Sequence, residues 1–251
     1  MRSASIGHAV FAVTLIGLGI LSLIQGDFSI IWQPVPKGAP ARDALIYLSA
    51  FIFVACGAGL LWRRTAALAA RVLLISLLLW FVFLRLPGVV LSFTVDMWWS
   101  ASKTAVMVAA AWVLYVWFAT DWDKQRFGFA TGETGLRIAR PLYGLALIPF
   151  GIAHFMYLDA TTVLVPHWLP LPATVWAYLT GAAYIAAGIA VIVGVYARLA
   201  ARLVALETGL ITLLVWVPIA VAGHPTDFQW GEVVVSIALT AAAWLVADSY
   251  R

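Results

Sequence analysis

The stretch Gly151–Pro170, GIAHFMYLDATTVLVPHWLP, determines how the rest of the chain is interpreted. It begins as an apolar helix that contains one histidine, His154, and it ends in a turn rich in proline, histidine and tryptophan. A weaker version of the same pattern begins at Gly19, 132 positions before Gly151. The two occurrences predict a chain built from two related halves.

The composition is that of a membrane protein. Of the 251 residues, 64% are hydrophobic and only 10% are charged, and the mean hydropathy is +1.00. A soluble domain carries about 25% charged residues, so most of this surface must be solvated by lipid. The net charge of +4 is small and lies mainly on one side, which indicates membrane topology and excludes a nucleic-acid-binding surface. The lipid bilayer is therefore the first expected partner.

Eight segments are long enough to span a bilayer, which takes about 20 mostly apolar residues. They are expected to be helices because the backbone of a spanning segment must satisfy its own hydrogen bonds. The sequence thus predicts an all-α polytopic membrane protein with spans at 6–24, 43–62, 66–86, 98–119, 141–158, 174–195, 199–221 and 231–248.

The lysines and arginines predict the orientation. Four of them belong to one side of the membrane, namely Lys37, Arg42, Arg85 and Lys103. Eleven belong to the other side, namely Arg2, Arg63, Arg64, Arg71, Lys124, Arg126, Arg137, Arg140, Arg198, Arg202 and Arg251. By the positive-inside rule, both termini are expected to lie in the cytoplasm. The chain is expected to reside in the cytoplasmic membrane of a bacterial cell. Lys103 is expected to snorkel outward, and Arg71 and Arg202 to contact lipid.

The internal repeat predicts the domain organisation. At an offset of 131–132 residues, Asp27 falls on Asp159 and the motif LAAR at 68–71 falls on LAAR at 199–202. The chain is therefore expected to contain two four-helix repeats, 1–120 and 141–251, joined by a cytoplasmic linker at 121–140. Because four is an even number, both repeats are expected to insert in the same direction. Small residues such as Gly57, Gly181 and Gly188 are expected to allow close helix packing.

Four motifs in the second half resemble the DoxX-like family of integral membrane proteins. They are G-x-x-HF at 151–155, VP-x-WLP at 165–170, YLTG at 178–181 and LAAR at 199–202. The resemblance covers about 100 residues and implies a four-helix membrane module associated with redox or sulfur-oxidation complexes. Similar proteins often carry a glutamate in the second helix of the module, where this chain has Tyr184.

Two polar residues inside the apolar spans are the candidate catalytic groups, His154 and Glu207. At the equivalent positions of the first half, the chain has Ser22 and Ser76. An ionisable side chain within a membrane costs a few kcal/mol to insert, about 3 kcal/mol on insertion scales, and is usually functional. Two interpretations stay open for each residue. Glu207 is either a protonated interhelical donor or a proton or ligand site, and His154 is either an interhelical donor or a proton relay.

An aromatic pocket is predicted around these two groups. Its ligand-binding residues would be Tyr157, Trp168, Tyr178, Tyr184 and His167. Such a pocket suits a quinone-like or other lipophilic molecule that exchanges protons with His154 and Glu207. Haem is not expected, because ligation by two histidines would need a second histidine at the depth of His154. No metal site is predicted, since the outer histidines and carboxylates match no zinc-binding pattern.

Three functions remain open at this stage. The first is a redox-associated membrane subunit, with the redox centre on a partner protein, and its redox character rests on the family resemblance alone. The second is a transporter or small-molecule binder with a site between the two halves. The third is a membrane scaffold that recruits a soluble partner through the linker at 121–140.

Overall fold

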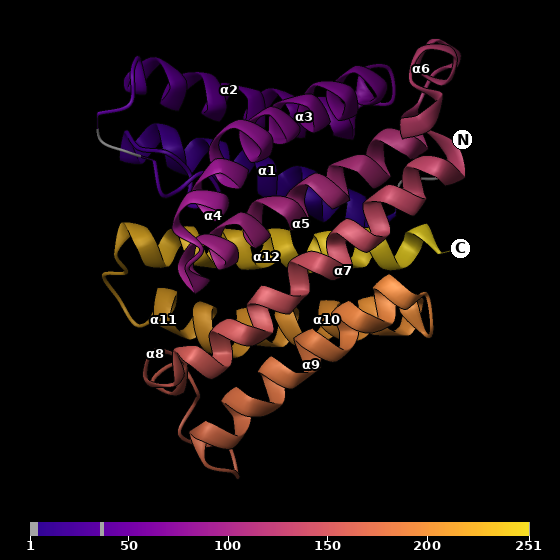
Figure 1. The fold of residues 1–251 in the computed structure, drawn as a ribbon. Helices are drawn as coiled ribbons and strands as arrows, with labels where there is room; N and C mark the ends of the chain where they lie inside the picture. Colours follow the sequence, from indigo (N-terminus) through magenta and orange to yellow (C-terminus); the bar gives the residue numbers. More distant parts are fainter. Residues whose placement is uncertain (1–4, 36–37, 251) are drawn as a thin grey trace.

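The computed structural model describes residues 5–35 and 38–250, and all of its regular structure is helical. Within these residues, eight helical segments are long and apolar enough to cross a membrane, which confirms the predicted all-α membrane fold (Figure 1). The eight are α1 (Ile6–Gln25), α2 (Arg42–Leu61), α3 (Ala66–Trp80) continued by α4 (Leu86–Ser92), α5 (Val95–Phe118), α7 (Gly132–Met156), α9 (Ala173–Val193), α10 (Ala197–Ile211) continued by α11 (Val217–Val221), and α12 (Asp227–Ser249). Short connecting helices are α6 (Asp121–Arg126), η2 (Gly128–Ala130) and α8 (Leu158–Thr162).

Two of the spans contain a wider helical turn just before a proline. The π-helical segments are η1 (Phe81–Arg85) between α3 and α4, and η3 (Thr212–Trp216) between α10 and α11. Each is followed by a proline, Pro87 or Pro218. Proline lacks an N–H and crowds the carbonyl four residues earlier, so a wider turn lets the helix continue past it. The third span therefore reaches Ser92, six residues beyond its predicted end at 86.

The fifth span begins earlier than predicted, because α7 starts at Gly132 rather than at 141. The segment 132–140 carries several charged residues, but they lie on one side of the helix. Gly135, Leu136 and Ala139 are buried, whereas Glu133 and Arg137 are exposed. An amphipathic extension of this kind lacks the uniform hydropathy by which membrane spans are identified.

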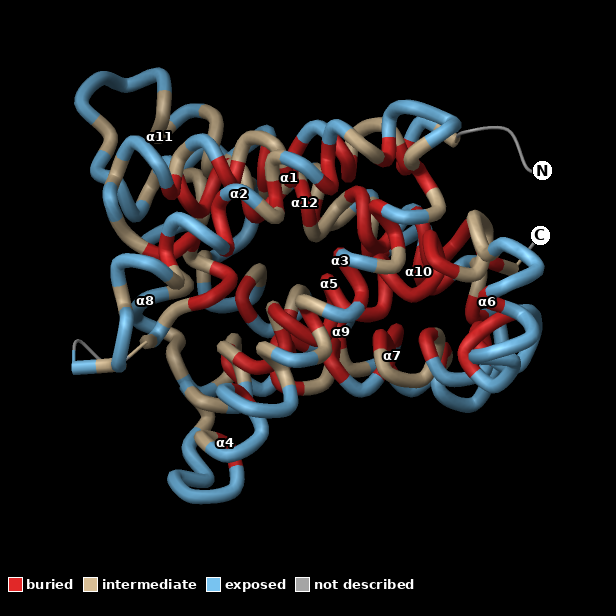
Figure 2. Tube along the Cα trace, turned by 90° about the horizontal axis from the view of Figure 1, so that it is seen from above, coloured by how far each residue is buried: buried red, intermediate tan, exposed pale blue. Residues whose placement is uncertain are grey.

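The two sets of four long helices have the same pattern of neighbours. In the first set α1 packs on α2, α2 on α3 and α3 on α5, while in the second α7 packs on α9, α9 on α10 and α10 on α12. Across the sets, α1 packs on α12, α7 packs on α5, and α5 packs on α12. The last helix of each set is consequently the most buried, as Figure 2 shows for the centre of the bundle. This arrangement agrees with the predicted duplication of a four-helix unit, which stays a prediction.

The termini and the linker helix α6 lie at one end of the bundle, which we name the termini end (Figure 1). Helices α4, α8 and α11 lie toward the other end, which we name the loop end. Arg2, Lys37 and Arg251, which entered the orientation argument, lie outside the described residues. Which end faces the cytoplasm stays a prediction.

Glycines allow the closest helix crossings. A Cβ on Gly151 would lie 2.4 Å from the carbonyl oxygen of Gly181, and one on Gly188 would lie 2.6 Å from that of Gly144. In the first set, a Cβ on Gly57 would lie 2.6 Å from the oxygen of Ala12. Backbones that approach this closely exclude any side chain, which confirms that Gly57, Gly181 and Gly188 allow close packing.

Candidate functional site

The close crossing of α7 and α9 brings His154 and Tyr184 together. Their ring centres are 5.5 Å apart, and the ring of Phe150 lies 5.7 Å from that of Tyr184. Nδ1 of His154 lies 2.7 Å from the carbonyl oxygen of Phe150. Because a carbonyl can only accept, Nδ1 carries the proton, and Nε2 of the neutral ring is left as an acceptor. His154 is thus oriented by its own helix and faces an aromatic neighbour.

Glu207 approaches the same region from α10. The residue is half-buried, and its carboxyl group interacts electrostatically with the phenols of Tyr143 and Tyr184. It forms no hydrogen bond or ion pair with any residue in the described part of the chain. The next residue, Thr208, is buried and faces α12, where Thr240 donates a hydrogen bond to its hydroxyl over 3.1 Å. Glu207 is therefore the ionisable group of this region that is free to bind a ligand.

A small cavity separates α7, α9 and α10. Its volume is about 20 Å³, and its lining residues are Val106, Tyr143, Leu147, Phe150, Tyr184, Val204, Thr208 and Leu239. A space of this size holds about one water molecule. The hydroxyl of Tyr143 is buried and has no hydrogen-bond partner among the described residues, so it would gain most from a polar occupant. A space of this size does not fit a quinone ring.

The other predicted ligand-binding residues lie nearer the loop end. Trp168, His167 and Tyr178 are exposed, and the ring of Tyr178 stacks on Phe155 at 5.8 Å. Tyr157 lies in the turn after α7, where a hydrogen bond to the Asp96 carboxylate raises the pKa of its phenol. The structure thus brings His154 and Tyr184 into contact and places Glu207 within electrostatic range of Tyr184. It places Tyr157, His167 and Trp168 in the turns at the loop end.

An ion pair between the two central helices was not predicted. Nζ of Lys103 on α5 lies 2.8 Å from Oε1 of Glu232 on α12, and the two side chains are 12% and 11% exposed. The ammonium also lies 4.9 Å from the centre of the Trp99 ring. The prediction that Lys103 snorkels outward is therefore wrong. The sequence offered one signal for this pair. Lys103 and Glu232 each lie a few residues after the first residue of their helix, and both helices begin at the loop end.

A second missed ion pair ties the linker to the bundle. Arg71, which we expected to contact lipid, instead places Nε 2.8 Å from Oδ1 of the buried Asp123 on α6. Burial alone would raise the pKa of this carboxyl, but hydrogen bonds from Arg71, Thr120 and Tyr115 outweigh it and lower the pKa to about 2. The capping box formed by Thr120 and Asp123 was the sequence signal for this helix start.

Metal ligands do not gather in the part of the chain that the structure covers. Across residues 5–35 and 38–250, no group of three or more histidine, cysteine, aspartate or glutamate side chains is arranged to hold a metal ion. The side chains of Glu207, Tyr184 and His154 are able to exchange protons and to form hydrogen bonds with a ligand.

Comparison with known proteins identifies the family of the second half. The DoxX family model matches residues 135–217, a segment that runs from the first turn of α7 through α9 and α10 to the start of α11. No curated protein and no solved structure matches the chain. With its eight apolar helices, the chain is an integral membrane protein whose residues 135–217 match the DoxX family.

Proposed function

We propose that this protein is a redox-associated membrane subunit that binds a quinone-like or other lipophilic molecule beside Glu207. Reduction of a quinone to a quinol consumes two electrons and two protons. In this proposal a partner protein supplies both electrons, Glu207 donates one proton to a quinone oxygen, and the second proton comes from water through His154; water then reprotonates Glu207. The redox assignment rests on the family resemblance, and the position of the ligand rests on the geometry of α7, α9 and α10.

The observation that carries the proposal is the unpaired carboxyl group of Glu207. A charged or protonated carboxyl within a bilayer usually pairs with another group, because an unpaired one costs several kcal/mol, about 3 kcal/mol on insertion scales. Glu207 has two phenols nearby and no bonded partner in the described chain. A ligand oxygen would complete its hydrogen bonding.

The small size of the cavity determines where such a ligand would lie. About 20 Å³ is too little for a ring, so we place the ligand at the bilayer-facing side of Glu207, which is half-buried, and not inside the bundle. Tyr184 and His154 then support the site from within. The loop-end aromatics Tyr157, Trp168 and Tyr178, together with His167, would line the approach from the loop end.

The transporter alternative has less support from the packing. One place for a site between the two halves is the contact of α5 and α12, beside the contacts of α1 with α12 and of α5 with α7. Both helices are tightly packed in their middle, where six alanines are 0–1% exposed, namely Ala109, Ala110, Ala111, Ala241, Ala242 and Ala243. The scaffold alternative has no specific observation in its favour.

Binding of a short-chain benzoquinone to the protein in lipid nanodiscs tests the proposal. We expect Glu207→Gln to weaken binding by up to about tenfold, because an amide is a weaker donor than a carboxylic acid and a neutral hydrogen bond contributes about 0.5–1.5 kcal/mol. Tyr184→Phe is expected to weaken it less. Glu133→Gln, which alters an exposed carboxylate on α7, is the matched control and should bind as the unmodified protein does. Equal affinity of the Glu207→Gln variant and this control would refute the proposal.

A further inference from the structure

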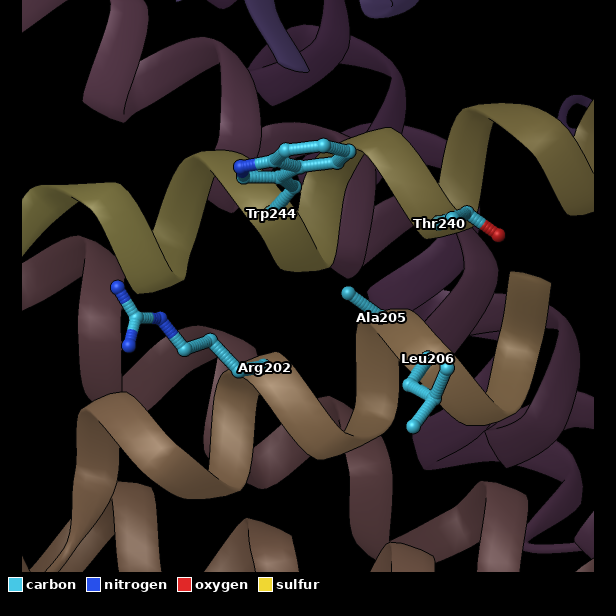
Figure 3. Close-up of a pocket in the computed structure, with 5 residues that line it drawn as sticks. All are labelled: Arg202, Ala205, Leu206, Thr240 and Trp244. Atoms are coloured by element: carbon cyan, nitrogen blue, oxygen red, sulfur yellow. The ribbon is translucent and has the colours of Figure 1, made fainter. Parts of the chain in front are cut away.

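A second site lies between α10 and α12, away from the cavity near Tyr184. A groove of about 340 Å³ runs between these helices and is lined by Arg202, Ala205, Leu206, Thr240 and Trp244. Figure 3 shows the guanidinium group of Arg202 extending from α10 toward α12, which carries Trp244 and Thr240. Grooves of this size are typical of sites for small ligands.

The charge in this groove is not neutralised by the protein. Arg202 is exposed and has no ion pair or hydrogen bond with any residue that the structure describes. Arg198, one turn earlier on the same face of α10, has a buried Nε without a partner. Two positive charges one turn apart on α10, of which Arg202 lines the groove, are suited to an anion with an apolar tail.

The first set of helices shows how an equivalent arginine is neutralised by an anion. Arg71 is the sixth residue of α3, as Arg202 is of α10, and each lies in the motif LAAR. The guanidinium of Arg71 binds the carboxylate of Asp123 and stacks on Trp122 at 4.5 Å. At the matching place in α10, the described chain offers no carboxylate to Arg202.

The tryptophans on α5 and α12 differ between the two sets in the same way as the two arginines: the first is covered by the linker and the second is not. Trp112 is the eighteenth residue of α5, as Trp244 is of α12. Nε1 of Trp112 donates to the carbonyl oxygen of Ala130 in the linker, and Trp112 is 8% exposed. Trp244 is 39% exposed. The linker thus covers this face in the first set, and the same face in the second set is open.

We propose that the groove between α10 and α12 binds an anionic phospholipid, with its phosphate on Arg202 and Arg198. The expected occupant is an amphiphile, because the groove combines the charge of Arg202 with the exposed apolar side chains of Leu203 and Leu206 on a membrane-spanning segment. Arg202 is about 8 Å along α10 from its start at the termini end, a depth that a lipid phosphate reaches. Guanidinium groups bind phosphate oxygens through paired hydrogen bonds. One acyl chain would lie along Ala205 and Leu206 against Trp244.

Lipid titration of the delipidated protein tests this site. The midpoint of thermal unfolding is measured while phosphatidylglycerol or phosphatidylcholine is added. A ligand that binds only the folded state raises the midpoint. We expect phosphatidylglycerol to be preferred, and Arg202→Gln to reduce this preference about fivefold, the effect of one arginine at an anionic surface.

Arg63→Gln is the matched control, because Arg63 is an exposed arginine at the same end of the bundle. It should keep the preference of the unmodified protein. Equal responses of Arg202→Gln and Arg63→Gln would overturn the proposal. If Arg202→Gln cannot be purified, Arg198→Gln is measured in its place, and an undiminished preference in that variant has the same meaning. Mass spectrometry that finds a fatty acid bound in place of a phospholipid would also overturn it.

Discussion

At the scale of single residues, the environment of an arginine decides its role. Arg71 and Arg202 occupy the same position in the same four-residue motif. The first is neutralised by a buried aspartate from the linker, and the second has no protein partner in the described chain. The sequence motif cannot distinguish them, because the difference lies in where the linker folds back.

Asp123 should make the stability of the linker depend on pH. Its pKa is lowered from 3.8 to about 2 in the folded protein, so its contribution is complete above about pH 4 and is lost as the pH falls through 2. We expect Asp123→Asn to lower the free energy of unfolding by about 2 kcal/mol at pH 7. Denaturation of both proteins between pH 2 and pH 7 should show the gap narrowing below pH 4.

The control for this experiment is Asp121→Asn. Asp121 pairs with Lys124, but the two side chains are 90% and 60% exposed, and such pairs contribute at most about 1 kcal/mol. A gap between the unmodified protein and Asp123→Asn that stays constant down to pH 2 would contradict the assigned role of Asp123.

At the scale of helices, the glycines of α7 and α9 should be intolerant of a side chain. A Cβ on Gly151 would lie 2.5 Å from Cγ1 of Ile185 as well as 2.4 Å from the Gly181 oxygen. We expect Gly151→Ala to destabilise the protein by about 1–3 kcal/mol through overpacking. Gly209→Ala is the comparison, because its Cβ would be 3.5 Å from the nearest atom, an ordinary contact. Thermal unfolding in detergent measures both, and equal midpoints would refute the expectation.

The helices α10 and α12 are joined by a chain of hydroxyl groups, which supports a second prediction at this scale. Thr212 and Ser236 place their hydroxyl oxygens 2.7 Å apart, and Thr240 bonds to Thr208. A double-mutant cycle with Thr212→Val and Ser236→Ala should give a coupling energy of about 0.6–1.7 kcal/mol, as for other interhelical hydrogen bonds in membranes. Additive effects of the two substitutions on unfolding would show that the contact contributes nothing.

The sequence was sufficient for the helices but only partly sufficient for the site. Long apolar runs identify spans without ambiguity, whereas the start of α7 was missed because its charges lie on one face. Glu207 and His154 stood out as polar groups within apolar segments. The pairing of Lys103 with Glu232 was missed because a side-chain contact between distant helices depends on which helix faces lie together.

At the scale of the whole molecule, the pair Lys103 and Glu232 joins the two sets of helices. We expect Lys103→Met to destabilise the protein by about 3–5 kcal/mol, because it leaves a buried carboxylate without a partner. The double substitution Lys103→Met with Glu232→Leu removes both charges and should recover most of the loss. Thermal unfolding in nanodiscs compares the three proteins. A double variant as unstable as the single one would contradict this account of the pair.

The same ion pair has a consequence for biosynthesis. Lys103 emerges from the ribosome 129 residues before Glu232, so the early helices reach the translocon with a cation whose counterion has not yet been made. Four further spans are inserted before the charge of Lys103 is neutralised, and the fourth of them, α12, carries Glu232. The final span therefore acts as the closing step of assembly, and a nascent chain truncated before it would expose an uncompensated charge to membrane quality-control proteases.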